Sequence, residues 1–156
     1  MEAPPFQEVQ EVLEFRANQV YELLEEFNYE FKRCTPQELY QYLVGEAKRD
    51  PSQTFRDRLG NEYLLLHTII EINELKEAGL EVNEETPLKA SPEKLLGAHL
   101  KATDYELGYS LILEDYYWLK HRLAHLGREI KAGRYSGGLR EKALEIYRSL
   151  LEYKDY

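Results

Sequence analysis

The chain is poor in cysteine and has no long apolar segment. Cys34 is its single cysteine, so an internal disulfide and a cysteine-based zinc site are both excluded. No stretch approaches the roughly 18 consecutive apolar residues that a membrane-spanning helix needs. The residues that follow Met1 lack the basic and apolar regions of a secretory signal peptide. These absences predict a cytoplasmic protein that does not enter a membrane.

Basic residues are outnumbered by acidic ones. The chain has 20 Lys and Arg against 29 Asp and Glu, which gives a formal net charge of −9. This balance argues against nucleic-acid binding, because such binding depends on neutralising phosphates. Residues 120–156 are an exception, with nine basic and five acidic side chains. They could form a solvated basic helix face, or they could dock on an unknown protein partner or on a second copy of the chain in a homo-oligomer.

No segment alternates apolar and polar residues over the length of a β-strand. A chain of 156 residues, 43% hydrophobic and 31% charged, suits one globular domain. We therefore predict an all-α, single-domain bundle of five or six helices over residues 1–156. The expected helices cover residues 5–32, 36–48, 51–78, 92–113, 115–132 and 139–154.

Capping patterns set several of these boundaries. Residues 35–38, Thr-Pro-Gln-Glu, combine an N-cap, a proline at the first helical position and a glutamate at the third. Residues 50–53 repeat this pattern and predict the start of the next helix. A break at residues 114–115 is expected because the apolar arc changes direction there, and Asp115 would cap the following helix. Residues 80–90 are predicted to form the main loop.

The expected helix 51–78 carries ionisable side chains within an apolar surface. At about 100° per residue, His67, Glu71 and Glu74 share one narrow stripe. Leucine, isoleucine and tyrosine side chains border this stripe on both sides. A buried ionisable group is costly unless it is paired, hydrogen-bonded or bound to a metal ion. The stripe therefore marks a candidate functional site.

The expected helix 92–113 carries a second stripe of the same kind, made of His99, Thr103, Glu106 and Ser110. Alanine and tyrosine side chains lie on one side of it, and leucine side chains lie on the other. If the two stripes face each other, two imidazoles and two or three carboxylates converge between the helices. The sequence does not fix whether they do.

Imidazole nitrogens together with carboxylate oxygens suit a divalent transition metal ion such as zinc, iron or manganese. We expect His67, Glu71, His99 and Glu106 to be its ligands. Glu74 would be a fifth ligand, or it would orient an imidazole from outside the ligand set. With one coordination position open, such a site could activate water for hydrolysis or bind oxygen.

Two alternatives remain open for the same residues. The histidines and glutamates could form a purely structural hydrogen-bonded network inside a non-enzymatic interaction or regulatory module. They could also form a metal-independent acid/base site, which requires a pocket that reaches solvent beside His67 and His99. The sequence therefore leaves it undecided whether the protein is an enzyme.

The segment from His121 to Gly127 resembles the His-x-x-x-His-x-Gly signature of the DinB-like metal-binding helical bundles. The resemblance covers seven residues and implies that His121 and His125 bind a metal ion. Helical phase argues against this role, because Leu119 and Leu123 mark the core face and both histidines point almost the opposite way. We expect the two histidines on a surface or at a subunit interface.

Overall fold

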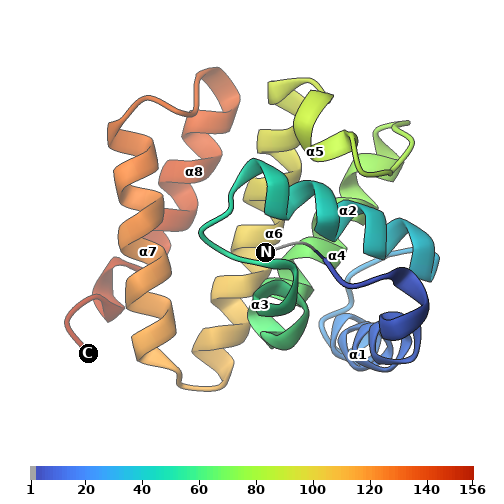
Figure 1. Cartoon of the computed structure of the whole chain (residues 1–156). Coiled ribbons are helices and arrows are strands. Elements are labelled where there is room, and N and C mark those ends of the chain that lie inside the picture. Colours follow the sequence, from blue (N-terminus) through green and yellow to red (C-terminus); the bar gives the residue numbers. More distant parts are fainter. Residues whose placement is uncertain (1–2) are drawn as a thin grey trace.

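Figure 1 shows the computed structural model of the chain, which describes residues 3–156. The described residues form helices and no strand, and the prediction of an all-α single-domain bundle is confirmed. None of these helices is both long and apolar enough to cross a membrane. The helices are α1 (Phe6–Glu26), α2 (Pro36–Arg49), α3 (Phe55–Gly60), α4 (Glu62–Glu77), α5 (Thr86–Lys89), α6 (Pro92–Ile112), α7 (Tyr116–Lys131) and α8 (Gly137–Ser149), followed by a 3-10 turn, η1 (Leu151–Tyr153).

Helix α6 lies between two apolar cores. In Figure 1, helices α1 to α5 gather on one side of α6, while α7 and α8 lie on the other. Ala98 and Ala102 of α6 belong to the core shared with α1, α2, α3 and α4. Leu100 and Leu107 belong to the core shared with α7 and α8. The two apolar arcs predicted for this helix therefore serve two different cores.

The polar stripe of α6 runs along the seam between these cores. Thr103, Glu106 and Ser110 are all buried there. Helix α4 packs more extensively against α6 than any other element does, which brings the two polar stripes together. The seam is thus both deeply buried and polar.

Several helix ends follow the predicted capping patterns. The Thr35 hydroxyl accepts a hydrogen bond from the backbone N–H of Glu38, whose carboxylate accepts one from the Thr35 backbone, completing a capping box. Asp115 caps α7 by accepting a hydrogen bond from the backbone N–H of Trp118 at 3.1 Å. The break at residues 114–115 is confirmed, and Glu114 has a positive φ of 56° there.

The expected single helix 51–78 is two helices. Asp50 accepts hydrogen bonds from Ser52 in a turn, and Thr54 and Asp57 form the capping box that starts α3. Asn61 then ends α3 and caps α4, because its side chain accepts a hydrogen bond from the backbone N–H of Leu64. Thr54 and Asn61 each supply a hydrogen-bond acceptor for the free backbone amides at the start of a helix. Two helices therefore begin in the segment where one was expected.

Three other expected boundaries also differ. The expected helix 5–32 ends at Glu26, because the backbone turns at Asn28 with a positive φ of 57° and buries Tyr29 in the core. The expected loop 80–90 contains the single turn α5. The expected helix 139–154 begins at Gly137, and its regular part ends at Ser149, before η1.

Candidate metal centre

Three side chains from α4 and α6 bring one atom each to a common point. His67 and Glu71 lie four residues apart on α4, so both face α6. His67 Nε2 is 2.8 Å from Glu71 Oε2 and 3.2 Å from His99 Nδ1. His99 Nδ1 is 3.2 Å from Glu71 Oε2, which closes a small triangle of two nitrogens and one oxygen. His67 and Glu71 are buried, and the His99 side chain is 15% exposed.

The dimensions of this triangle suit a transition metal ion. An ion about 2.1 Å from each of the three atoms would stand about 1 Å above their plane, with ligand–metal–ligand angles of about 85–100°. Two histidines and one carboxylate on one face of a metal ion form a facial triad, which leaves the opposite positions open. A water molecule or a substrate atom would occupy those positions.

The far side of the His67 ring is held by Glu106. His67 Nδ1 donates a hydrogen bond to Glu106 Oε1 at 2.9 Å, which directs Nε2 toward the triangle. Glu106 is itself held by the Arg122 guanidinium, at 2.7 and 3.0 Å, and by the Trp118 indole N–H at 2.8 Å. Glu106 therefore orients the His67 ring, and its carboxylate contacts the ring nitrogen opposite the triangle.

The other two members of the triangle also have partners on their far atoms. His99 Nε2 lies 3.7 Å from Glu129 Oε1, and Glu129 is paired with Arg134. The Tyr42 hydroxyl donates a hydrogen bond to Glu71 Oε1 at 2.8 Å. Ligand histidines in metalloproteins commonly have a carboxylate or carbonyl on the second ring nitrogen, which fixes the ring orientation. His67 and Glu71 have hydrogen-bonded support of this type, and His99 has a carboxylate 3.7 Å from its second ring nitrogen.

The protonation of His67 follows from its neighbours. Burial opposes a charged imidazole, but Glu71 and Glu106 outweigh burial and raise the pKa of His67 to about 9. Burial likewise opposes the charged Glu106, yet hydrogen bonds and charges from His67 and Arg122 lower its pKa to about 2. In the absence of a metal ion, the His67 Nε2–H therefore donates to Glu71. A metal ion would replace this proton, because two unprotonated acceptors do not face each other stably at 2.8 Å.

The remaining two pKa values agree with this assignment. Burial lowers the pKa of His99, so its imidazole is neutral near pH 7 and one ring nitrogen keeps a free lone pair. Although burial opposes its charge, His67 and His99 hold the pKa of Glu71 well below its usual range. The triangle thus offers a carboxylate, a neutral imidazole and one imidazole that must lose a proton.

A cavity of about 480 Å³ leads to the triangle. Glu46 of α2 also lines this cavity, with 3% of its surface exposed. Its Oε2 contacts Arg49 and Arg58, whereas its buried Oε1 has no hydrogen-bond partner among the described residues. Burial first, and then the nearby Glu71, raise the pKa of Glu46. The cavity therefore combines the triangle with a carboxylate that has one free oxygen.

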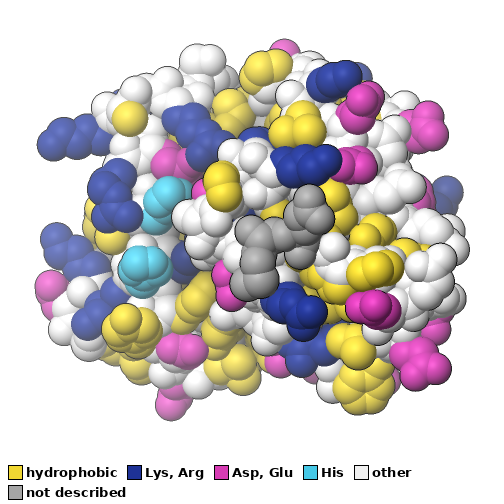
Figure 2. Space-filling model, in the orientation of Figure 1, with side chains coloured by type: hydrophobic (Ala, Val, Ile, Leu, Met, Phe, Trp, Pro, Cys, Tyr) yellow, Lys and Arg dark blue, Asp and Glu magenta, His cyan; other side chains and the backbone are white. Residues whose placement is uncertain are grey.

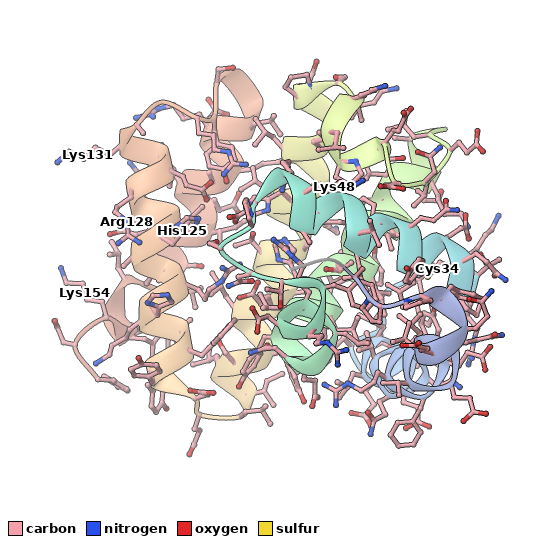
Figure 3. The ribbon with its side chains drawn as sticks, in the orientation of Figure 1. Cys34, Lys48, His125, Arg128, Lys131 and Lys154 are labelled. Atoms are coloured by element: carbon pink, nitrogen blue, oxygen red, sulfur yellow. The ribbon has the colours of Figure 1, made fainter. Side chains whose placement is uncertain are left out.

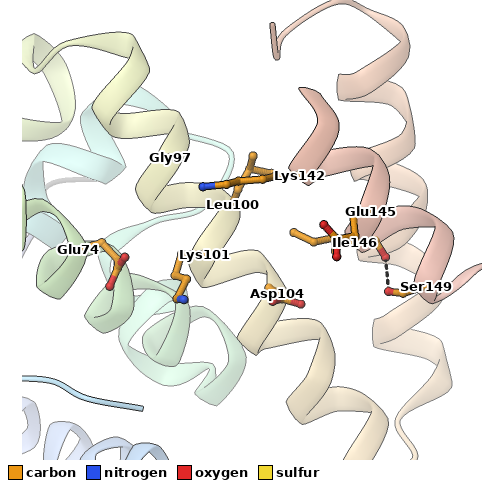
Figure 4. A pocket seen from close by; sticks show the side chains of 9 residues that line it. All are labelled: Glu74, Gly97, Leu100, Lys101, Asp104, Lys142, Glu145, Ile146 and Ser149. Atoms are coloured by element: carbon orange, nitrogen blue, oxygen red, sulfur yellow. Dashed lines mark hydrogen bonds between the residues drawn. The ribbon is translucent and has the colours of Figure 1, made fainter. Parts of the chain in front are cut away.

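Glu74 lies apart from the triangle. Its Oε2 accepts a hydrogen bond from the Tyr29 hydroxyl at 2.7 Å. Its side chain lines a different cavity, of about 380 Å³, between α6 and α8. Figure 4 shows this cavity, with Glu74 on α4 across from Lys101 and Asp104 of α6. The structure thus brings together His67, Glu71, His99 and Glu106, but it does not bring Glu74 to them.

His121 and His125 are exposed, as expected, but they also line the cavity of the triangle. His125 Nε2 lies 3.5 Å from Glu129 Oε1, the carboxylate behind His99. In Figure 3, His125 lies on the side of α7 that faces the rest of the molecule, whereas Arg128 and Lys131 extend away from it. The two histidines therefore lie on the surface, as expected, and part of this surface is the wall of the cavity.

Sequence reasoning missed most of the supporting residues, namely Tyr42, Glu46, Arg122 and Glu129. They come from α2 and α7, and their partners depend on how the helices pack. A sequence signal did exist for two of them. Glu46 follows the apolar face of α2, and Glu129 lies between two core positions of α7, so both interrupt an apolar stripe.

A comparison of the chain with protein-family models, with curated proteins and with solved structures found no match. The functional argument therefore depends on the geometry of the chain itself.

Proposed function

We propose that His67, Glu71 and His99 bind one divalent metal ion, and that this ion activates a water molecule. The observation that carries the proposal is the convergence of one atom each from His67, Glu71 and His99. His67 and Glu71 are also held by hydrogen bonds on their opposite atoms. Zinc, iron and manganese all accept two imidazoles and a carboxylate. Glu106 would keep the role it has in the structure, as the group that orients His67.

Glu46 is the carboxylate best placed to act as general base. It lines the same cavity and has a free buried oxygen. The pKa of Glu46 is raised towards neutral pH, and a carboxylate with a higher pKa is a stronger base. In this scheme Glu46 takes one proton from the metal-bound water, and the resulting hydroxide is the nucleophile.

Metal analysis of the purified protein tests the proposal directly. The protein is stripped with a chelator and titrated with Zn²⁺, Fe²⁺ or Mn²⁺, and the bound metal is counted by mass spectrometry. We expect one ion per chain in the wild type. The variants Glu71→Gln and His99→Gln should bind at least about 100-fold more weakly, because each removes a ligand.

Glu74→Gln is the matched control. It removes a carboxylate from the same helix, one turn beyond Glu71, but from a side chain outside the triangle. Its metal affinity should equal that of the wild type. Failure of all three metal ions to bind the wild type, or an equal loss in Glu74→Gln, would overturn the proposal.

A structural network is the second candidate, and one observation favours it. With a proton on His67, both its ring nitrogens and both oxygens of Glu71 have hydrogen-bond partners without any metal ion. A non-enzymatic interaction module would then bind no metal, and Glu71→Gln would lower only the stability. The same titration, combined with urea unfolding of each variant, separates the two functions.

A further inference from the structure

The wall of the triangle's cavity carries arginine side chains and no lysine among the described residues. Arg58 and Arg122 are largely buried and hold Glu46 and Glu106 in place. Arg49 and Arg134 differ from them, because their side chains are 35% and 39% exposed. These two arginines are therefore the ones that a ligand in the cavity can reach.

Arg49 and Arg134 come from different elements and keep donors to spare. Arg49 lies in the last turn of α2 and donates to Glu46 Oε2 through Nη2 at 3.0 Å. Arg134 lies in the connection between α7 and α8 and contacts Glu129 through Nη1. A guanidinium has five N–H donors in a rigid planar arrangement, which matches oxyanions well. Each of these ion pairs leaves several donors for a ligand.

The side of the cavity that α7 forms carries several basic side chains although the chain is acidic overall. Burial and then the charges of Arg122, Arg128 and Arg134 lower the pKa of His125. Figure 2 shows histidine side chains among Lys and Arg side chains on the face formed by α7. An anion that enters past these groups is attracted toward the triangle.

We propose that the cavity binds a phosphate monoester, with one phosphate oxygen on the metal ion and the others held by Arg49 and Arg134. This inference rests on the metal site proposed above. A phosphate group is tetrahedral and doubly charged, so its oxygens can reach a metal ion and two guanidinium groups at once. A carboxylate has only two oxygens, so two of these three partners would have to share one oxygen. The cavity volume of about 480 Å³ lies within the range of small-molecule sites.

The corresponding reaction is hydrolysis of the ester. The oxygen of the metal-bound water forms a bond to phosphorus, and the bond between phosphorus and the ester oxygen breaks. Glu46 takes the proton that the water loses and releases it to solvent, and the leaving oxygen, on the opposite side of phosphorus, takes a proton from solvent. The products are an alcohol and inorganic phosphate, and no further reactant is needed. Arg49 and Arg134 stabilise the charge on the phosphate oxygens while the bonds change.

Phosphate binding to the metal-loaded protein is the first test. Inorganic phosphate is titrated into the full chain by calorimetry, and hydrolysis of p-nitrophenyl phosphate is measured beside that of p-nitrophenyl acetate. We expect phosphate binding and phosphate-ester hydrolysis in the wild type. Arg49→Gln and Arg134→Gln should each weaken phosphate binding at least about 10-fold, the equivalent of one lost charge-assisted contact.

Arg128→Gln is the matched control, because it removes the same charge from α7 at a side chain outside the cavity. Its phosphate affinity should stay within about twofold of the wild type, since a change of this size reflects only the distant field. Arg134→Lys is a second variant that keeps the charge beside Glu129 and thus the fold. It should still bind phosphate less tightly than the wild type, because lysine lacks the planar fork.

The outcomes separate this inference from the proposed metal site. Normal metal content without phosphate binding, or faster hydrolysis of the acetate than of the phosphate ester, would overturn the inference and leave the metal site standing. Absence of bound metal would overturn the proposed function and the hydrolysis with it. An equal loss of phosphate affinity in Arg49→Gln, Arg134→Gln and Arg128→Gln would also overturn the phosphate inference. Such a result would mean that Arg49 and Arg134 make no local contact with phosphate.

Discussion

Removal of the Arg122 side chain should destabilise the protein more than any exposed ion pair could. Glu106 has no exposed surface, and Arg122 contacts both of its oxygens, at 2.7 and 3.0 Å. Arg122→Met keeps most of the side-chain length but leaves a buried carboxylate without one of its two cationic partners, since only His67 remains. Breaking a buried pair in this way costs about 3–5 kcal/mol of the free energy of unfolding.

The pKa of Glu106 gives a value for the net effect of burial, His67 and Arg122 on the same carboxylate. The folded protein lowers this pKa from 4.5 to about 2, and each pKa unit corresponds to about 1.4 kcal/mol. The charged carboxylate therefore contributes about 3 kcal/mol to stability at neutral pH. Because the folded pKa is the lower one, this contribution is fully present above about pH 4.5 and is lost as the pH falls towards 2. Both values describe one charge and are not added.

Urea unfolding followed by circular dichroism measures this quantity. We expect Arg122→Met to lower the free energy of unfolding by about 3 kcal/mol at pH 7, and by much less near pH 2. In a Glu106→Gln background the same substitution should cost about 1 kcal/mol, because no buried charge is left behind. The exposed pair of Lys89 and Glu85 is the control, and Lys89→Met should cost less than about 0.5 kcal/mol. A cost of Arg122→Met below 1 kcal/mol, or an equal cost in both backgrounds, would refute the reasoning.

The remaining predictions concern the support of Glu71 and two helical glycines, Gly45 of α2 and Gly108 of α6. Tyr42→Phe removes the donor to Glu71 and should weaken metal binding about 10- to 100-fold in a metal titration, whereas Tyr117→Phe, at a side chain 83% exposed, should have no effect. Gly45→Ala should cost about 1–3 kcal/mol in urea unfolding, because a Cβ there would collide with a backbone carbonyl of the segment before α5. Gly108→Ala has open space around the added methyl group and should instead stabilise the protein by about 0.5–1 kcal/mol.

Local signals predicted those helix boundaries that depend on neighbouring residues. The capping box at Thr35 and the cap at Asp115 are satisfied within three residues of the chain, so the sequence alone reveals them. The start predicted at Asp50 failed because Thr54 offers an equally good cap four residues later. Arg58 donates to the Asp50 and Gln53 carbonyl oxygens, which keeps residues 50–53 in a turn. The choice between Asp50 and Thr54 as the helix cap therefore depends on the hydrogen bonds from Arg58.

Helical phase predicted the direction of the site residues but not their position along the helix. His67 and Glu74 share a stripe, yet seven residues separate them by about 10 Å along the axis. Glu74 therefore lies beyond the point where His99 approaches α4, and it meets Tyr29 instead. The same distance separates His99 from Glu106, which explains why Glu106 contacts the far nitrogen of His67 rather than the triangle. Whether two residues meet along the helix axis depends on where the two helices cross. The polar stripe of one helix gives no information about that crossing point.

The polar seam of α6 has two halves with different chemistry. Thr103 and Ser110 donate to carbonyl oxygens of their own helix, so these hydroxyls are satisfied without help from another element. His99 and Glu106 instead depend on α4 and α7 for their partners. Replacing a buried ionic network with apolar side chains of similar size is often neutral or stabilising, so stability alone does not account for this half of the seam. The proposed metal ion would account for it, because ligand side chains must be polar, inward-facing and held in orientation by a further set of buried groups.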